Sequence, residues 1–259
     1  MKKRIFLFYL AALLCSFNTW SQETSPGDSI QALPGKAREL LMQGKKAEAS
    51  EICLKFMQSH PGNKSAVQWW IIANMERSPE GEQKMLPRLD SLGRLFPSNT
   101  AIKFFKTFIL AEYGKNEEAL AGMEELIALQ PDSSVNYVGK GQALYELKRY
   151  GEALEAFEKA ISLDPRRNDL YGMKASVFAR LERYDEAVAA LDKGVEANPG
   201  FATNYYNRAC IYALKGEKAK AVVDLARAIS MNPRFKQSAV KDEDFKSLYE
   251  DDEFKKLTQ

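Results

Sequence analysis

Residue types that bind metals or act as nucleophiles are sparse in this chain of 259 residues. His60 is the single histidine, and the three cysteines are Cys15, Cys53 and Cys210. A zinc site needs several nitrogen or sulfur donors at close spacing, but there is no second histidine to pair with His60, and Cys53 and Cys210 are far apart. The sequence therefore predicts no metal site and no cofactor. Cys53 and Cys210 are expected to be buried free thiols.

Motifs for covalent catalysis or phosphate binding do not occur in the sequence either. There is no Gly-x-Ser-x-Gly, no His-Glu-x-x-His and no glycine-rich phosphate loop. Acidic residues are frequent, but runs such as Glu117-Glu118 are typical of solvated helix surfaces. We therefore expect a protein that binds other molecules and is not an enzyme.

The N-terminus has the three parts of a secretory signal peptide, predicted over residues 1–21. Lys2, Lys3 and Arg4 form a basic start, an apolar stretch follows, and Thr19-Trp20-Ser21 precedes a cleavage site before Gln22. Residues 22–29 are predicted to be a flexible leader. This pattern predicts a periplasmic or secreted protein of bacterial type without a membrane span in the mature chain. An alternative is lipid anchoring at Cys15, although Leu14 is larger than the residue such a signal prefers before the cysteine.

The charge balance argues against nucleic acid as a partner. The full chain has 37 basic and 35 acidic residues. Loss of residues 1–21 removes three basic residues, so 34 basic residues would face 35 acidic ones. No basic excess remains to attract a phosphate backbone.

Prolines recur along the chain at a nearly constant spacing. The first gap is 36 residues and the next four are 34 residues each. A period of about 34 residues is typical of helix–turn–helix repeats. We divide the chain into repeats that end at these prolines and a C-terminal cap, namely 30–61, 62–97, 98–131, 132–165, 166–199, 200–233 and the cap 234–259.

Large and small residues keep their register within the fourth repeat. Tyr137, Gly141 and Leu144 share one face of the first helix, and Ala153 and Phe157 lie on the second helix. Equivalent residues in the fifth and sixth repeats are Tyr171, Ala175, Phe178, Ala187, Leu191, Tyr205, Ala209, Tyr212, Ala221 and Leu225. This pattern closely resembles the tetratricopeptide repeat family. The resemblance implies an all-α, right-handed α-solenoid of about six repeats.

The second repeat is the least regular. Its first helix could follow a register that begins at Val67 or at Trp69, and Pro87 either opens or kinks its second helix. Adjacent aromatics on one helix point about 100° apart, so one residue of Trp69-Trp70 and one of Phe104-Phe105 could mark a partner surface or a contact between copies. Complete burial by neighbouring helices would explain these pairs equally well.

The family resemblance implies that the first helix of each repeat lines a concave groove for a protein or peptide partner. The residues expected there are Phe104, Phe108, Gln142, Tyr145, Met173, Ser176, Arg180, Tyr206, Asn207 and Cys210. Packing between repeats is an equally good explanation for each aromatic residue among them. The lysine, asparagine and arginine clamp of chaperone-binding members is missing, because Val138, Gln142 and Met173 stand at three of its positions.

Three other functions fit the same pattern. One is an outer-membrane-anchored assembly lipoprotein of a pilus or secretion system, which depends on Cys15. Another is a structural spacer that forms homo-oligomers. The last is a regulatory subunit attached to an enzyme on another chain.

Overall fold

The computed structural model describes residues 32–75 and 79–259 of the chain. Within these ranges every regular element is a helix, and no β-strand occurs. The predicted signal peptide at 1–21, Cys15 and the leader at 22–29 lie outside the described residues.

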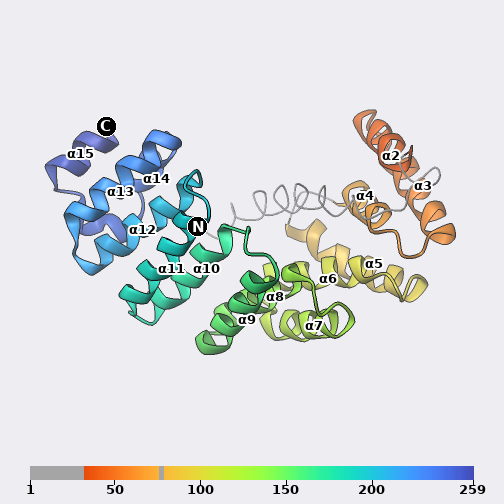
Figure 1. Cartoon of the computed structure of the whole chain (residues 1–259). Coiled ribbons are helices and arrows are strands. Elements are labelled where there is room, and N and C mark those ends of the chain that lie inside the picture. The colour runs from red at the N-terminus through yellow and green to blue at the C-terminus, as the bar shows by residue number, and fades with distance from the viewer. Residues whose placement is uncertain (1–31, 76–78) are drawn as a thin grey trace. The chain divides into compact units, whose positions relative to one another are not determined.

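Consecutive helices form six pairs, and a tail of three short helices follows (Figure 1). In all six pairs the second helix ends two residues before one of the periodic prolines, because proline lacks the backbone N–H and clashes with the preceding turn. The pairs are α2 (Ala32–Met42) with α3 (Lys46–Ser59), α4 (Lys64–Asn74) with α5 (Pro79–Leu95), α6 (Thr100–Glu112) with α7 (Asn116–Leu129), α8 (Ser134–Glu146) with α9 (Tyr150–Leu163), α10 (Asp169–Arg180) with α11 (Tyr184–Ala197), and α12 (Ala202–Lys215) with α13 (Lys218–Met231). The architecture is an all-α solenoid built from helix pairs.

In five of these pairs the turn between the two helices has one residue in the left-handed region. Glycine takes this position at Gly44, Gly114 and Gly216, with φ values of 76°, 72° and 83°. Lys148 and Glu182 take it in the fourth and fifth repeats, with φ values of 61° and 57°. Glycine adopts this conformation without steric cost, whereas a side chain costs about 1 kcal/mol.

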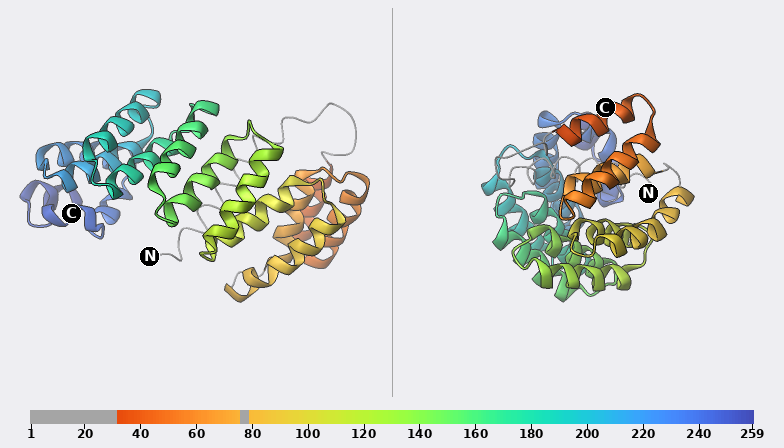
Figure 2. Two further views of the ribbon diagram at one scale, coloured as in Figure 1. Left: turned by 90° about the horizontal axis from the view of Figure 1, so that it is seen from below. Right: turned by 90° about the vertical axis from the view of Figure 1, so that its right-hand side faces the viewer.

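Close packing divides the chain into two compact units, residues 1–129 and 130–259. We call them unit 1 and unit 2 and describe each separately. In unit 2 each helix packs on its partner, and α9 to α12 also pack between neighbouring pairs (Figures 1 and 2). Gly141 on α8 makes the close approach to α9, because a Cβ atom there would lie 2.6 Å from the ring of Phe157. The small residue in this pattern is therefore a steric requirement.

In unit 1 the second repeat departs from this arrangement. Val67 and Ile71 are fully or almost fully buried, so α4 follows the register that begins at Val67. The second helix, α5, has 17 residues where the second helices of the other repeats have 14, and Pro87 lies inside it. Ile71 and Met85 occupy the positions that Gly141 and Ala153 hold in the fourth repeat. These larger side chains keep the backbones of α4 and α5 apart, so the two helices meet through buried side chains of one core cluster, and the close backbone contacts of α5 are with α6.

The aromatic pairs of unit 1 are mostly interior. Phe104 and Phe105 are both buried, and their rings meet edge to face at 6.0 Å between centroids. Trp70 is buried and Trp69 is half-buried against the same core. Complete burial by neighbouring helices therefore explains the phenylalanine pair, and neither of its rings marks an exposed patch.

The tail packs on the last repeat of unit 2. It consists of α14 (Phe235–Ala239), the 3-10 helix η3 (Glu243–Leu248) and α15 (Asp252–Thr258). Phe245, Leu248 and Phe254 are buried in one cluster with residues of α12 and α13, including Leu225. The acidic segment that contains them thus buries its apolar side chains and exposes most of its charges.

Candidate functional site

Predicted groove residues of α8 and α10 contact each other in unit 2. Arg180 donates a hydrogen bond from Nε to the hydroxyl oxygen of Tyr145 at 2.8 Å. On the same two helices, Gln142 Nε2 lies 4.0 Å from the sulfur of Met173, one turn before Tyr145 and two turns before Arg180. Ser176, between Met173 and Arg180 on α10, is exposed, and its hydroxyl donates to the Gly172 carbonyl at 3.0 Å.

The same row continues from α10 to α12. Gly172 lies under the side chain of Asn207, since a Cβ atom there would come within 2.7 Å of Asn207 Nδ2. The Asn207 amide makes no hydrogen bond to another described residue. It is half-buried, so its donors and acceptor are open to a ligand on this surface.

Two acidic residues of the tail extend the row beyond α12. Asp242 accepts a hydrogen bond from the Tyr206 hydroxyl at 2.8 Å, and its Oδ2 lies 3.9 Å from the sulfur of Cys210. Asp244 is half-buried, and no cation pairs with its carboxylate among the described residues. We name this surface the first-helix face of unit 2, and its members are Gln142, Tyr145, Met173, Ser176, Arg180, Asn207, Asp242 and Asp244.

Sequence reasoning placed Asp242 and Asp244 in the cap and did not include them in the site. A signal for Asp244 was present, because Gln142, Ser176, Cys210 and Asp244 are each separated by 34 residues. Extension of the period past the last repeat would have placed Asp244 on the same face.

Electrostatics give the first-helix face one cationic and one anionic region. The hydrogen bond with Tyr145 raises the pKa of Arg180 further above its ordinary value, so the guanidinium stays charged. Burial, followed by the nearby charge of Asp242, raises the pKa of Asp244, and Arg180 opposes this shift. The face therefore presents a cationic point on α10 and an anionic point on the tail.

The other predicted groove residues lie elsewhere. Phe104 and Phe108 belong to unit 1, where Phe104 is buried and Phe108 is half-buried. Tyr206 and Cys210 are on α12 but are buried, and the Tyr206 ring stacks on Phe235 of the tail at 4.5 Å. Within the described residues, these side chains serve packing, so only the half-buried Phe108 has a partly accessible ring.

One group of metal-type ligands occurs within the described residues. The donor atoms of Cys210, Asp242 and Asp244 lie within 4.8 Å of one another. Burial and the neighbouring carboxylates raise the pKa of the Cys210 thiol well above its ordinary value, which favours the neutral thiol. Asp242 also accepts a hydrogen bond from the Asp244 backbone N–H at 3.3 Å as the N-cap of η3. This carboxylate joins the tail to α12.

The helix pairs and the left-handed turn residues define a helical-repeat protein. Residues 137–167 and 173–234 match two sequence families, both described as Tetratricopeptide repeat. The chain is a tetratricopeptide repeat protein. None of the curated proteins matches it in sequence.

Solved structures of similar fold include several repeat proteins. A tetratricopeptide repeat protein from Parabacteroides merdae is 20% identical, covers 90% of this chain and 98% of its own, and has a TM-score of 0.58. YrrB, described as a TPR protein with an unusual peptide-binding site, is 19% identical, covers 74% and 99%, and has a TM-score of 0.52. MamA residues 41 to the end from Desulfovibrio magneticus RS-1 are 19% identical, cover 68% and 99%, and have a TM-score of 0.52. At these identities the likeness concerns the fold.

Among the helices that the structure describes, none has the length and apolar character needed to cross a bilayer. Tetratricopeptide repeat proteins bind protein or peptide partners and are typically non-catalytic scaffolds.

Proposed function

We propose that the protein is an exported, non-catalytic scaffold that binds a peptide or protein segment along the first-helix face of unit 2. The supporting observation is the open hydrogen-bonding capacity of Asn207, which packs over Gly172 on the same face that carries the Tyr145–Arg180 pair. Side-chain amides can donate to and accept from an extended peptide backbone, and tyrosine and arginine contribute strongly to binding energy at interfaces.

The two unlike charges suggest the chemistry of the bound segment. Nη groups of Arg180 make no ion pair with a described carboxylate, so an acidic group of the partner can reach them. The carboxylate of Asp244 makes no ion pair with a described residue and suits a basic group of the partner. The best partner is therefore a segment that carries one acidic and one basic group.

The test uses peptides selected from a random library on the wild-type protein. Their dissociation constants are measured by fluorescence anisotropy for the wild type and for Tyr145→Ala with Arg180→Ala. We expect affinity to fall by about tenfold or more, because truncation of interface tyrosine and arginine commonly has effects of this size. Helical content and Tm should stay nearly unchanged, since Arg180 is exposed and Tyr145 is only half-buried.

A matched control replaces the same residue types outside the face. Tyr184→Ala with Arg166→Ala removes one tyrosine and one arginine from other parts of unit 2. This variant should bind the selected peptides with wild-type affinity. If the face variant is folded and binds as tightly as the control, recognition takes place on another surface.

Export is a separate part of the proposal and rests on residues 1–21 of the sequence. Mass spectrometry of the protein from its native host should find a chain that begins at Gln22. A chain that begins at a lipid-modified Cys15 would instead favour the assembly lipoprotein of a pilus or secretion system.

A further inference from the structure

The irregular second repeat leaves a pocket in unit 1. Ile71 and Met85 hold α4 and α5 apart, and a pocket of about 560 Å³ opens beside the end of α4, lined also by α3 and α5. Its volume lies within the range of small-molecule sites, which is roughly 300–1,000 Å³.

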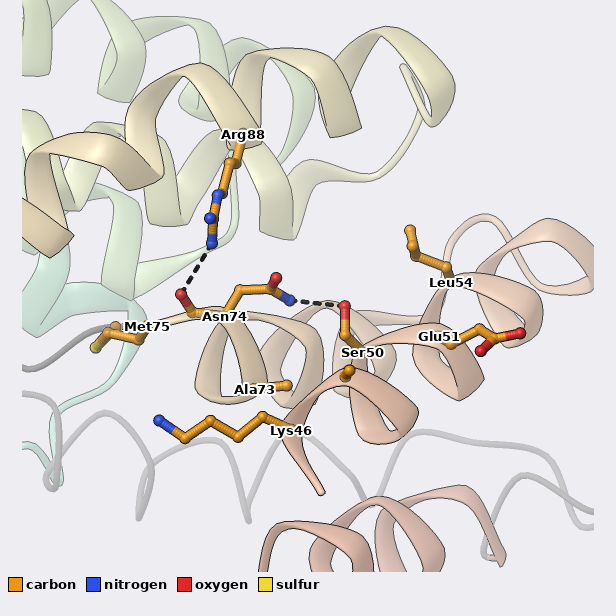
Figure 3. Close-up of a pocket in the computed structure, with 9 residues that line it drawn as sticks. Lys46, Ser50, Glu51, Leu54, Ala73, Asn74, Met75 and Arg88 are labelled. Atoms are coloured by element: carbon orange, nitrogen blue, oxygen red, sulfur yellow. Dashed lines mark hydrogen bonds between the residues drawn. The ribbon is translucent and has the colours of Figure 1, made fainter. Parts of the chain in front are cut away.

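Two cationic side chains approach this pocket from different helices. Figure 3 shows Arg88 of α5 and Lys46 of α3 on opposite sides of the end of α4. Arg88 donates from Nη1 to the Asn74 carbonyl at 3.2 Å, which holds the guanidinium at the pocket and leaves its other nitrogens free to donate. Lys46 makes no ion pair with a described residue.

The remaining polar groups of the pocket are already satisfied or point outward. Asn74 donates to the Ser50 hydroxyl at 2.8 Å, which fixes the amide between α3 and α4. Glu51 pairs with Lys55 at 2.6 Å, and its carboxylate is directed away from Asn74 in Figure 3. Among the described residues that line the pocket, no carboxylate therefore neutralises Lys46 or Arg88.

Apolar side chains complete the wall. Leu54 and Met75 both line the pocket and are only half-buried, so they offer contact area to a ligand. A guanidinium binds a carboxylate through two parallel hydrogen bonds, and an ammonium adds a point charge. The pocket thus combines a carboxylate-type anchor with an apolar contact surface.

We propose that this pocket binds a carboxylate attached to a small apolar group, with the carboxylate on Arg88, the positive charge of Lys46 across the end of α4, and the apolar part on Met75 or Leu54. A free small molecule and an acidic residue next to an apolar residue in a peptide share this chemistry. The site is in unit 1 and is independent of the first-helix face.

Calorimetric titration of the full chain tests the proposal with two carboxylate probes, benzoate and a terminally blocked Glu-Phe dipeptide. We expect at least one of them to bind, and the tighter one identifies the source of the carboxylate. Benzamide has the same shape as benzoate without the charge and should not bind. Inorganic phosphate should bind more weakly than the better carboxylate, because it has no apolar part. Absence of binding by both carboxylates, or equal binding of benzamide or phosphate, would overturn the proposal.

Variants locate the bound probe. Lys46→Gln with Arg88→Gln should weaken binding of the better carboxylate by about tenfold or more, since hydrogen bonds to charged groups have effects of this size. Lys36→Gln with Arg94→Gln removes the same charge from exposed sites of unit 1 and should leave affinity unchanged. Equal weakening by both pairs of changes would reveal general charge attraction and would exclude the site.

A filling variant avoids any change of charge. Ala47 lines the pocket and is exposed, so Ala47→Phe can fill the space without entering the core. Binding of the better carboxylate should be lost in this variant while its circular dichroism spectrum matches the wild type. Retention of full affinity would contradict the pocket as the site.

Discussion

The carboxyl group of Asp244 carries an energetic penalty in the folded protein. Burial and the charge of Asp242 raise its pKa above the ordinary value, although Arg180 counters part of the effect. Between the ordinary pKa and the raised pKa, the folded state binds more protons than the unfolded state. The free energy of unfolding therefore decreases as pH rises through this window, and the penalty is complete above the raised pKa.

Asp244→Asn should remove this penalty. We expect the variant to have a higher Tm than the wild type at neutral pH. The difference should disappear below the ordinary pKa of aspartate, where the wild-type carboxyl is also neutral. Thermal melting followed by circular dichroism across this pH range measures the effect.

Glu253→Gln is the control, because Glu253 is an exposed acid of the same tail. It should not reproduce the pH-dependent gain. A lower Tm for Asp244→Asn at neutral pH would mean that the carboxylate makes a stabilising contact and that its burial is not the dominant effect.

At the scale of single residues, the repeat period predicts which residues lie on the same face, but it does not predict which side chains contact each other. Gln142, Ser176, Cys210 and Asp244 follow one spacing, so their common row could be read from the sequence. Tyr145 and Arg180 form a hydrogen bond although they are 35 residues apart. A strict period of 34 residues does not pair these two positions. The Tyr206 ring packs against Phe235 and Phe245 of the tail, which lies beyond the last periodic proline.

At the scale of helices, regular repeats were predictable because size at a few positions decides the packing. Gly141 beside Phe157 is a steric requirement that the sequence displays directly. In the second repeat, Ile71 and Met85 signalled a departure from the pattern, but large residues at a helix contact can be accommodated in several ways. Their consequence, a separation of α4 and α5 with a pocket beside it, depends on the packing of α5 on α6.

The tail is the helical element whose removal should have the largest effect on unit 2. Phe245, Leu248 and Phe254 bury their side chains on the sixth repeat. Deletion of residues 234–259 would expose this apolar surface, and we expect a loss on the order of 3 kcal/mol or more, since each buried side chain of this size contributes roughly 1.5–3 kcal/mol. Denaturant unfolding and size-exclusion chromatography should show lower stability and self-association.

Substitution separates loss of packing from loss of chain length. Phe245→Ala with Phe254→Ala keeps the tail but removes two buried rings, and it should reproduce most of the loss of stability. Glu243→Ala with Lys256→Ala changes two exposed residues of the same segment and should have little effect. If the truncated chain stays monomeric and equally stable, the tail is not needed to cover the sixth repeat, and a role in recognition would be favoured instead.

At the scale of the whole chain, the sequence predicts six equivalent repeats, whereas close packing separates residues 1–129 from 130–259. The period of 34 residues passes through Pro131 without interruption. The period specifies how each helix pair forms. Contacts between successive pairs depend on side chains at positions where the period requires no particular residue type. The sequence therefore predicted the repeat architecture and did not predict its division into two compact units.

Each of the two units has one cysteine from Gln22 onward, namely Cys53 in unit 1 and Cys210 in unit 2. Cys53 is fully buried in unit 1 and Cys210 is buried in unit 2, and both are free thiols. Burial raises the pKa of Cys53 to about 12, and that of Cys210 is also raised, so neither thiolate forms readily in the closed state. A thiol-modifying reagent should react with each cysteine only during transient openings. The labelling rate of each of these two cysteines therefore reports how often its own unit opens. Comparison of the two rates would show whether unit 1 and unit 2 open together or independently.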